Sequence, residues 1–208
     1  MGSSEYHKEQ CRSCLQKKHC YRRRKTPGKI NALLDEKLKN VRWGEFKVGE
    51  LFEIKNTLSF NADKLVSGNE YDYVTRTSFN QGILQTTGFV NQENLNDSGT
   101  WSLGLLQMDF FYRRKPWYAG QFVRKIIPKF KLSENTILYF STLLNMQKRK
   151  LLSVLVRNVD ETFRNLFLSL PITAEGEIDF DFMESFIREL GAVLEVINRL
   201  QKGRPFLC

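Results

Sequence analysis

The sequence lacks any uninterrupted apolar segment of roughly 18 residues, the length that a membrane-spanning helix requires. It also lacks an apolar segment behind the basic residues near its N-terminus, which a secretory signal would need. We therefore expect no membrane contact and a cytoplasmic location. At 208 residues, the chain is long enough for one domain of ordinary size with an appendage.

Histidine is nearly absent, and this limits the chemistry that the chain can perform. The two histidines are His7 and His19, so residues 20–208 contain no histidine for acid–base catalysis. The sequence also has no glycine-rich phosphate loop, no nucleophile elbow and no paired-histidine zinc helix. Methyltransferase cofactor loops and nuclease motifs are absent as well. We expect a protein that is not an enzyme and that needs no cofactor; a self-contained nuclease or methyltransferase is the least favoured alternative.

Cysteine is scarce, and three of the four cysteines lie in the first twenty residues. In a cytoplasmic chain, clustered cysteines suggest a metal before a disulfide. The spacing Cys11-x2-Cys14-x4-His19 fits the first three ligands of a zinc knuckle, but Arg24 occupies the place of the fourth. We expect reduced thiols and no metal. The alternative is a zinc site built from Cys11, Cys14 and His19 with Cys20 or His7 as the fourth ligand, although Cys20 directly follows His19 and cannot easily share its metal.

The net charge of +9 is concentrated in one segment. Residues 1–42 contain twelve Lys and Arg against four Asp and Glu, a net of +8, so residues 43–208 carry only +1. Residues 71–131 contain eight basic and four acidic side chains, whereas residues 175–202 contain three basic and seven acidic ones. A localised basic excess is typical of proteins that bind nucleic acid, although a solvated arm without a specific partner gives the same pattern.

The pattern of apolar residues predicts an α/β (α+β) fold made of short strands and helices. Strands are expected at 71–77, 83–90, 101–112 and 122–127, with helices at 29–38 and 133–155. We divide the chain into a basic arm (1–28), a globular domain (29–177), a C-terminal helix (178–202) and a tail (203–208).

The C-terminal helix has an apolar stripe of the coiled-coil kind, formed by Phe186, Leu190, Val193, Ile197 and Leu200. Asp179 or Asp181 can cap its first turn, and Glu184 would complete a capping box with Asp181. Because acidic residues flank this stripe, we expect it to contact a protein partner. The alternative is that the helix packs only on its own core.

Two segments carry side chains suited to nucleic-acid recognition. The first, residues 75–82, presents an arginine, hydroxyls and carboxamides beside a glycine turn, and the second, residues 113–121, combines three cations with two aromatics. The candidate DNA-contacting residues in these segments are Arg76, Thr77, Asn80, Gln81, Arg113, Arg114, Lys115, Tyr118 and Gln121. The alternative is that Arg76 forms a scaffold ion pair and that Trp117 and Tyr118 belong to the core.

The order of several motifs resembles the target-recognition domain of DNA-specificity subunits in type I and type IIB-like restriction–modification systems. These motifs are the segments at 43–54, 73–82, 120–124 and 170–180, which begin with Trp43-x2-Phe46-Lys47-Val48-Gly49 and end with Leu170-Pro171-Ile172 and Gly176-Glu177-Ile178. The resemblance covers about residues 43–200, and it adds Arg124 to the candidate DNA contacts. It implies a module that reads half of a bipartite site in double-stranded DNA. It further implies a conserved-region helix that pairs with its counterpart and docks methyltransferase and, in some systems, restriction subunits.

The chain departs from this family pattern in two respects. Family members normally carry two such modules in tandem, whereas this sequence has one, followed by a helix of about twenty-four residues. We therefore expect either a half-length subunit that forms a homodimer or a partial product. The basic arm is not part of the family pattern. The second hypothesis is accordingly a small basic nucleic-acid-binding protein that acts through its N-terminal arm, with or without zinc.

Overall fold

A computed structural model describes residues 29–202 of the chain, which divides into two compact units, residues 1–40 and 41–208. In the first unit the described part is helix α2 (Lys29–Asn40). The predicted arm with Cys11, Cys14, His19 and Cys20 lies outside the described residues, and so does the tail at 203–208.

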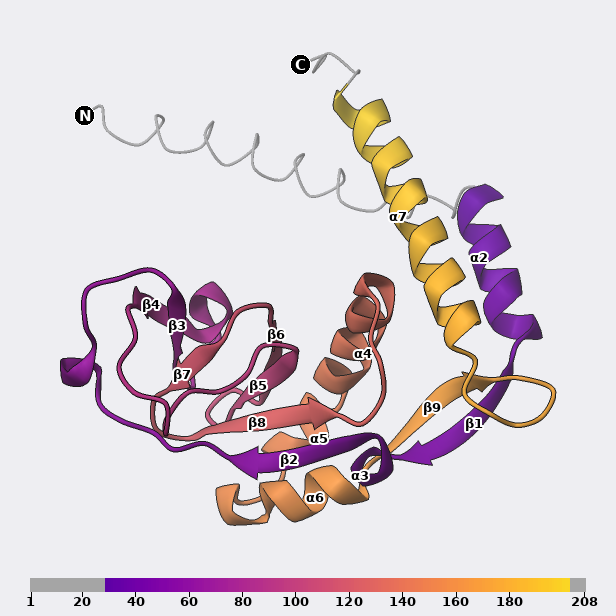
Figure 1. Cartoon of the computed structure of the whole chain (residues 1–208). Helices are drawn as coiled ribbons and strands as arrows, with labels where there is room; N and C mark the ends of the chain where they lie inside the picture. The colour runs from indigo at the N-terminus through magenta and orange to yellow at the C-terminus, as the bar shows by residue number, and fades with distance from the viewer. Residues whose placement is uncertain (1–28, 203–208) are drawn as a thin grey trace, which may run out of the picture. The chain divides into compact units, whose positions relative to one another are not determined.

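The second unit alternates short strands and helices, which confirms the predicted mixed α/β fold (Figure 1). Its strands are β1 (Arg42–Lys47), β2 (Phe52–Asn56), β3 (Tyr71–Val74), β4 (Ile83–Thr87), β5 (Thr100–Gly104), β6 (Asp109–Arg113), β7 (Trp117–Ala119), β8 (Val123–Pro128) and β9 (Phe167–Ile172). Its α-helices are α3 (Val48–Leu51), α4 (Glu134–Met146), α5 (Lys148–Leu152), α6 (Val159–Asn165) and α7 (Phe180–Lys202), with 3₁₀ turns η2 (Ala62–Lys64), η3 (Phe79–Gly82) and η4 (Val156–Asn158).

The main core forms between a four-stranded sheet and the helices around it. The strand order of this sheet is β2-β8-β5-β6, and every pairing in it is antiparallel. Phe52 of β2 packs edge-on against both Trp101 and Phe140, which joins the sheet to α4. The indole of Trp101 donates to Ser141 Oγ of α4 at 2.8 Å, so this buried polar group has a partner.

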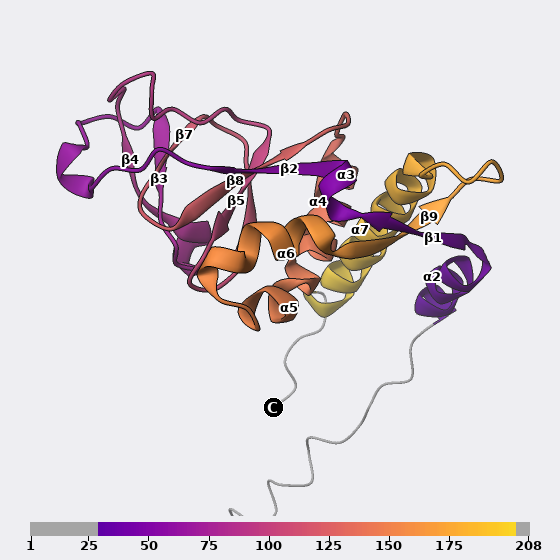
Figure 2. The ribbon, with the colours of Figure 1, turned by 90° about the horizontal axis from the view of Figure 1, so that it is seen from below.

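A second sheet has the strand order β4-β3-β7 and lies at the end of the domain away from α7 (Figures 1 and 2). Strand β4 pairs with β3 in an antiparallel hairpin, as predicted, whereas β7 runs parallel to β3. Tyr118 of β7 is completely buried beneath Phe60 and Tyr71. These aromatic contacts give the small sheet a core of its own.

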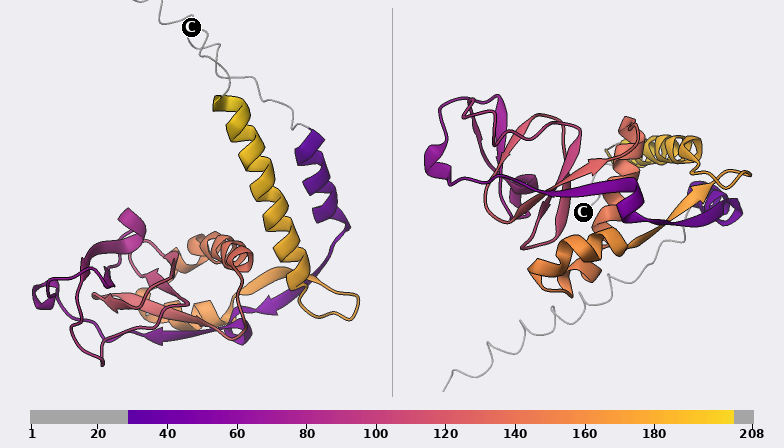
Figure 3. Two further views of the ribbon diagram at one scale, coloured as in Figure 1. Left: turned by 45° about the horizontal axis from the view of Figure 1, so that its top comes forward. Right: turned by 60° about the horizontal axis from the view of Figure 1, so that its bottom comes forward.

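Strands β1 and β9 form a two-stranded antiparallel sheet, in which Arg42 pairs with Ile172 and Lys47 pairs with Phe167. Helix α7 follows β9, and Asp179 Oδ1 accepts a hydrogen bond from Phe182 N at 2.8 Å, which confirms the predicted cap. The first turns of α7 pack against α4 and bury Met183 completely (Figure 3).

Three predictions about the elements were wrong, and two elements were missed. The segment at 101–112 is two strands joined by a turn at 105–108, and the segment at 133–155 breaks at Gln147 into α4 and α5. Strand β7 and helix α6 were not foreseen. Glu184 does not form a capping box with Asp181; it accepts hydrogen bonds from Ser133 Oγ and Asn135 Nδ2 instead. Among the described residues, no helix is long and apolar enough to cross a membrane.

Candidate nucleic-acid interface

Three turns meet at one end of the two larger sheets, where β3, β5 and β7 end and β4, β6 and β8 begin. We call residues 75–82, 105–108 and 120–122 the three-turn surface. Leu105 N donates to Phe122 O at 2.9 Å, which joins the second turn to the third. A Cβ on Gly104 would lie 2.9 Å from the carbonyl oxygen of Arg76, so this glycine lets the first turn approach the second.

The backbone of the three-turn surface is unusually constrained. Of the residues that the structure describes, four that are not glycine have positive φ, and all four lie here: Asn80 (45°), Gln81 (56°), Met108 (55°) and Phe122 (62°). Such conformations cost free energy and cluster at functional sites, where the surrounding structure enforces them. The concentration of all four on one surface marks it as a candidate site.

The side chains of this surface combine charge, amides and aromatic rings. The guanidinium of Arg76 lies over the Phe122 ring, 5.2 Å from its centroid. Phe79 is 87% exposed, and the side chains of Asn80 and Gln81 are exposed beside it. Gln121 is also exposed and precedes Phe122. Arginine and carboxamides suit base edges, and exposed rings suit stacking.

A basic segment borders the three-turn surface through Asp109, the first residue of β6. Asp109 accepts from Ser78 Oγ of the first turn and from Lys148 Nζ of α5, the latter at 2.5 Å. Residues 145–158 contain four basic side chains and no acidic one: Lys148, Arg149, Lys150 and Arg157. Sequence reasoning overlooked this segment because it was assigned to one long helix, although the run Lys148-Arg149-Lys150 is a visible signal.

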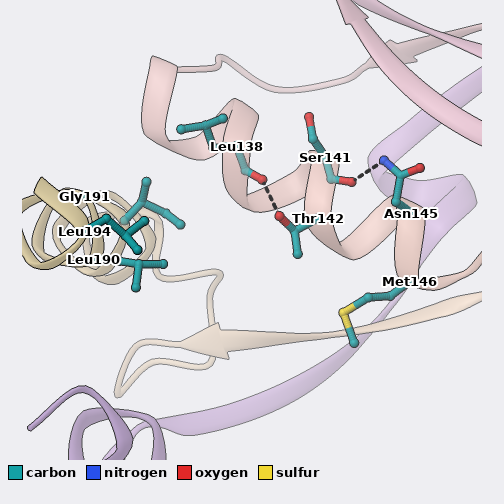
Figure 4. A pocket seen from close by; sticks show the side chains of 9 residues that line it. Leu138, Ser141, Thr142, Asn145, Met146, Leu190, Gly191 and Leu194 are labelled. Carbon is teal, nitrogen blue, oxygen red and sulfur yellow. Dashed lines mark hydrogen bonds between the residues drawn. The ribbon is translucent and has the colours of Figure 1, made fainter. Parts of the chain in front are cut away.

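A second candidate surface is an apolar groove between α4 and α7, with a volume of about 680 Å³ (Figure 4). Leu138, Met146 and Leu194 are each more than half exposed there. The complete lining is Leu138, Ser141, Thr142, Asn145, Met146, Ile187, Leu190, Gly191 and Leu194.

Residues 40–201 match the protein family described as the type I restriction modification DNA specificity domain. The chain belongs to this family. A similar protein is the specificity subunit S.BcgI of a type II restriction enzyme from Heyndrickxia coagulans, which is 23% identical over 154 residues, or 74% of this chain and 45% of the relative.

Solved structures of specificity subunits share the fold of this specificity domain. The HsdS subunit from Thermoanaerobacter tengcongensis superposes with a TM-score of 0.56 at 13% identity, over 95% of this chain and 49% of the other. The S subunit of a type I restriction–modification system from M. genitalium superposes with a TM-score of 0.53 at 14% identity, over 82% of this chain and 45% of the other. The chain therefore spans about half the length of the proteins that it matches.

Two of the predicted DNA contacts in this specificity domain require correction, because they are core residues. The side chain of Arg113 is 2% exposed, and burial lowers its pKa to about 10. Tyr118 is fully buried, and its hydroxyl accepts hydrogen bonds from Val90 N and Asn91 N and donates to Asn91 O. Neither side chain lies where DNA could reach it in this conformation.

The other predicted residues fall into two groups. Arg76, Thr77, Asn80, Gln81 and Gln121 lie together on the three-turn surface. Arg114 and Lys115 follow the opposite end of β6, about 15 Å away for a five-residue strand. Arg114 there pairs with Glu134 at 2.5 Å, and Lys115 lies 3.5 Å from Asp72.

Arg124 lies near the start of β8 and is paired with Asp160 of α6 at 2.9 Å, with 20% of its side chain exposed. This ion pair ties β8 to α6. DNA contact by Arg124 stays a prediction, as it does for the exposed residues of the three-turn surface.

The predicted interface stripe on α7 is described only in part. Phe186, Leu190 and Val193 are half-buried, and the side chains of Ile197 and Leu200 lie outside the described part. Phe186 and Ile187 pack against the main core, so the beginning of the helix contacts its own domain. Residues 138–146 of α4 were not foreseen as part of this surface, because sequence alone does not show which helix lies beside α7.

Proposed function

We propose that this chain is a non-catalytic DNA sequence-specificity subunit of a restriction–modification complex. In this proposal it recognises half of a bipartite site in double-stranded DNA through the three-turn surface. It docks methyltransferase subunits, and restriction subunits where they are present, through α7. Membership of the specificity-domain family supports this role, and the single specificity domain matched at residues 40–201 fits recognition of one half-site.

The observation that carries the DNA-reading part is the composition and rigidity of the three-turn surface. Arg76 and the carboxamides of Asn80 and Gln81 offer the donor and acceptor patterns that match guanine and adenine edges in the major groove. Their backbone is held in conformations that a free loop rarely adopts. The basic residues of α5 adjoin this surface and can supply phosphate contacts, which position the protein without reading sequence.

The protein-docking part of the proposal rests on α7 and the groove beside it. The groove is apolar, and residues 175–202 carry seven acidic side chains against three basic ones, which disfavours DNA there. In the family relatives that carry two modules, a second helix would be the neighbour. A methyltransferase subunit, a second copy of this chain, or both are the proposed occupants.

Selection from a randomised duplex library tests sequence reading directly. The full chain is incubated with the library at moderate salt, bound duplexes are recovered through several rounds, and the enriched sequence is determined. We expect a short enriched motif of half-site size. Recovery of duplexes without any common motif would contradict the specificity role.

The salt dependence of binding tests the contribution of α5. Replacing Arg149 and Lys150 by glutamine should reduce the slope of log affinity against log salt by about 2, since each phosphate contact contributes about 0.9. The matched control is the pair Lys55→Gln and Lys131→Gln, two exposed lysines that lie outside the three-turn surface and α5. An equal reduction of the slope in both double variants would show that α5 does not contact the DNA.

A second candidate function is nucleic-acid binding by the N-terminal arm, which the charge of +8 in residues 1–42 favours. In that case the binding would be strong but without sequence preference. The same library selection separates the two functions, because only the first gives an enriched motif.

A further inference from the structure

Arg113 is a buried cation held by neutral groups. Its Nε donates to Ser102 Oγ at 2.9 Å, and its Nη2 donates to Ser102 Oγ at 2.6 Å and to the carbonyl oxygen of Gln81 at 2.5 Å. Among the described residues, no carboxylate forms an ion pair with this guanidinium. The charge of Asp72 raises the pKa of Arg113 against the larger lowering by burial, but Asp72 is itself paired with Lys115. A buried charge with such partners is costly, so its presence calls for a reason other than packing.

The acceptor that Arg113 reaches belongs to the most constrained turn of the molecule. Asn80 and Gln81 both have positive φ, and Gly82 follows them at 77°. The carbonyl of Gly82 accepts from Thr75 N at 2.7 Å. The successive carbonyls of Gln81 and Gly82 therefore both accept hydrogen bonds from groups within the domain. A Cβ at Gly82 would lie 3.1 Å from the carbonyl oxygens of Thr75 and Thr77, and 3.4 Å from Arg113 Nη2.

Because the carbonyls of Gln81 and Gly82 point inward, the turn presents its side chains outward. The side chains of Asn80 and Gln81, consecutive residues of this turn, are both exposed, and so is Arg76 of the same turn. Asn80 Nδ2 donates to Ile83 O at 3.2 Å, which further restricts the direction of that carboxamide. Each of these two carboxamides, on a fixed backbone, offers one donor and one acceptor that match the adjacent N7 and N6 of adenine in the major groove.

We propose that Arg113 is a positioning residue for sequence readout: from inside the domain it holds the Asn80–Gln81 turn so that the two carboxamides read an A·T base pair. Arg113 itself does not touch DNA. This inference rests on the proposed function, because it assumes that the three-turn surface contacts base edges.

The test uses the full chain and the duplex that the wild-type protein selects from the randomised library. Affinity is measured for three kinds of duplex: the selected one, a series in which each A·T pair in turn is replaced by G·C, and a scrambled duplex. We expect Arg113→Met to lose roughly tenfold discrimination at one A·T position, within the range of a bidentate base contact. Affinity for the scrambled duplex and its salt dependence should stay the same, because no phosphate contact is removed.

Two further variants separate positioning from a general structural role. The exposed pair Asn80→Gly and Gln81→Gly retains a backbone that tolerates positive φ but removes both carboxamides, so it should lose discrimination at the same position. Combining this pair with Arg113→Met should add no further loss, because both changes remove one interaction. Gln85→Ala, which removes an exposed carboxamide on the neighbouring strand β4, is the matched control and should change nothing.

Each outcome decides between the two proposals. Full discrimination in a folded Arg113→Met protein would overturn the inference and leave the specificity role intact. Where Arg113→Met does not fold, the glycine pair decides, since both side chains are exposed, and retained discrimination there overturns the inference. If the wild type selects no motif, the proposed function fails and the inference fails with it.

Discussion

At the scale of single residues, Tyr139 of α4 shows how burial couples a proton to folding. Its side chain is 8% exposed, and burial raises the pKa of its hydroxyl to about 12 from an ordinary value of 10. The folded state therefore favours the neutral phenol. This contribution to stability is fully present below pH 10 and is lost as the pH rises from 10 towards 12.

Replacing Tyr139 by phenylalanine should make the protein more resistant to alkaline unfolding. The variant keeps the buried ring and removes the group that must ionise. We expect urea midpoints close to those of the wild type at pH 8 and a smaller decrease between pH 10 and 11.5. A wild-type and a variant curve that fall in parallel across this range would show that Tyr139 does not control the transition.

The contrast between Arg113 and Arg76 shows what sequence reasoning can and cannot determine about a residue. Both arginines were predicted as DNA contacts from their neighbours in the sequence, and composition gave no means to distinguish them. Arg113 is the last residue of β6, and its side chain points into the space beneath the first turn, whereas Arg76 is exposed. Which side of a short strand faces inward depends on pairing with β5, which a local pattern does not reveal.

At the scale of elements, Glu184 fastens α7 to α4. Its carboxylate accepts from Ser133 Oγ and from Asn135 Nδ2, the latter at 2.5 Å. These hydrogen bonds, to Ser133 first and then to Asn135, hold its pKa below the ordinary value of 4.5. The contact therefore stabilises α7 above about pH 4.5 and is lost as the pH falls through the lowered pKa.

Glu184→Gln should weaken this attachment at neutral pH and remove its dependence on acid. We expect faster amide hydrogen exchange in residues 183–190 of the variant at pH 7, with a difference from the wild type that shrinks as the pH falls below 4.5. Ala192→Gln, at an exposed position on the same helix, is the control. Unchanged exchange in Glu184→Gln at pH 7 would show that apolar packing alone holds the helix.

The sequence predicted an element correctly where its own turn residues and apolar spacing determine its structure. The β3–β4 hairpin and α2 follow from turn residues and apolar spacing, and α7 begins at the predicted Asp179 cap. The error at 101–112 has a physical cause: the turn at 105–108 is itself mostly apolar, with Leu105 and Met108 buried, so its composition resembles that of the buried strand β5 before it. Likewise, α4 ends at Gln147 without glycine or proline, and Leu155 is 60% exposed rather than buried.

At the scale of the whole molecule, most of the net charge lies outside the specificity domain matched at residues 40–201. Residues 1–42 carry a net charge of +8, whereas residues 43–208 carry +1. Deleting residues 1–25 should therefore leave a cooperative thermal transition and weaken binding to a scrambled duplex, while the motif selected from the library stays the same. Calorimetry and the library selection measure these two properties. Loss of the motif on truncation would show that the arm takes part in reading the DNA sequence.

Assembly should depend on the groove between α4 and α7. Leu194 is 53% exposed at its edge, so Leu194→Glu places a charge in the groove without disturbing the core. We expect this variant to lose association with a second copy or with a methyltransferase subunit in light scattering and pull-down, with DNA binding retained. Ala192→Glu adds the same charge at an exposed position that does not line the groove, and it should assemble normally. Equal assembly of both variants and the wild type would remove the groove from the interface.

The pairing of β1 with β9 has a consequence for how such proteins can change. The two strands lie side by side in antiparallel register, so the first and last residues of the segment 48–166 lie close together in space. A segment whose two ends are adjacent can be exchanged for another of different length without moving what precedes or follows it. Recombination within β1 and β9 would therefore transplant an entire module in one step and leave α7 as it was. Because α4 lies within the exchanged segment, the new module would also bring its own side of the groove beside α7.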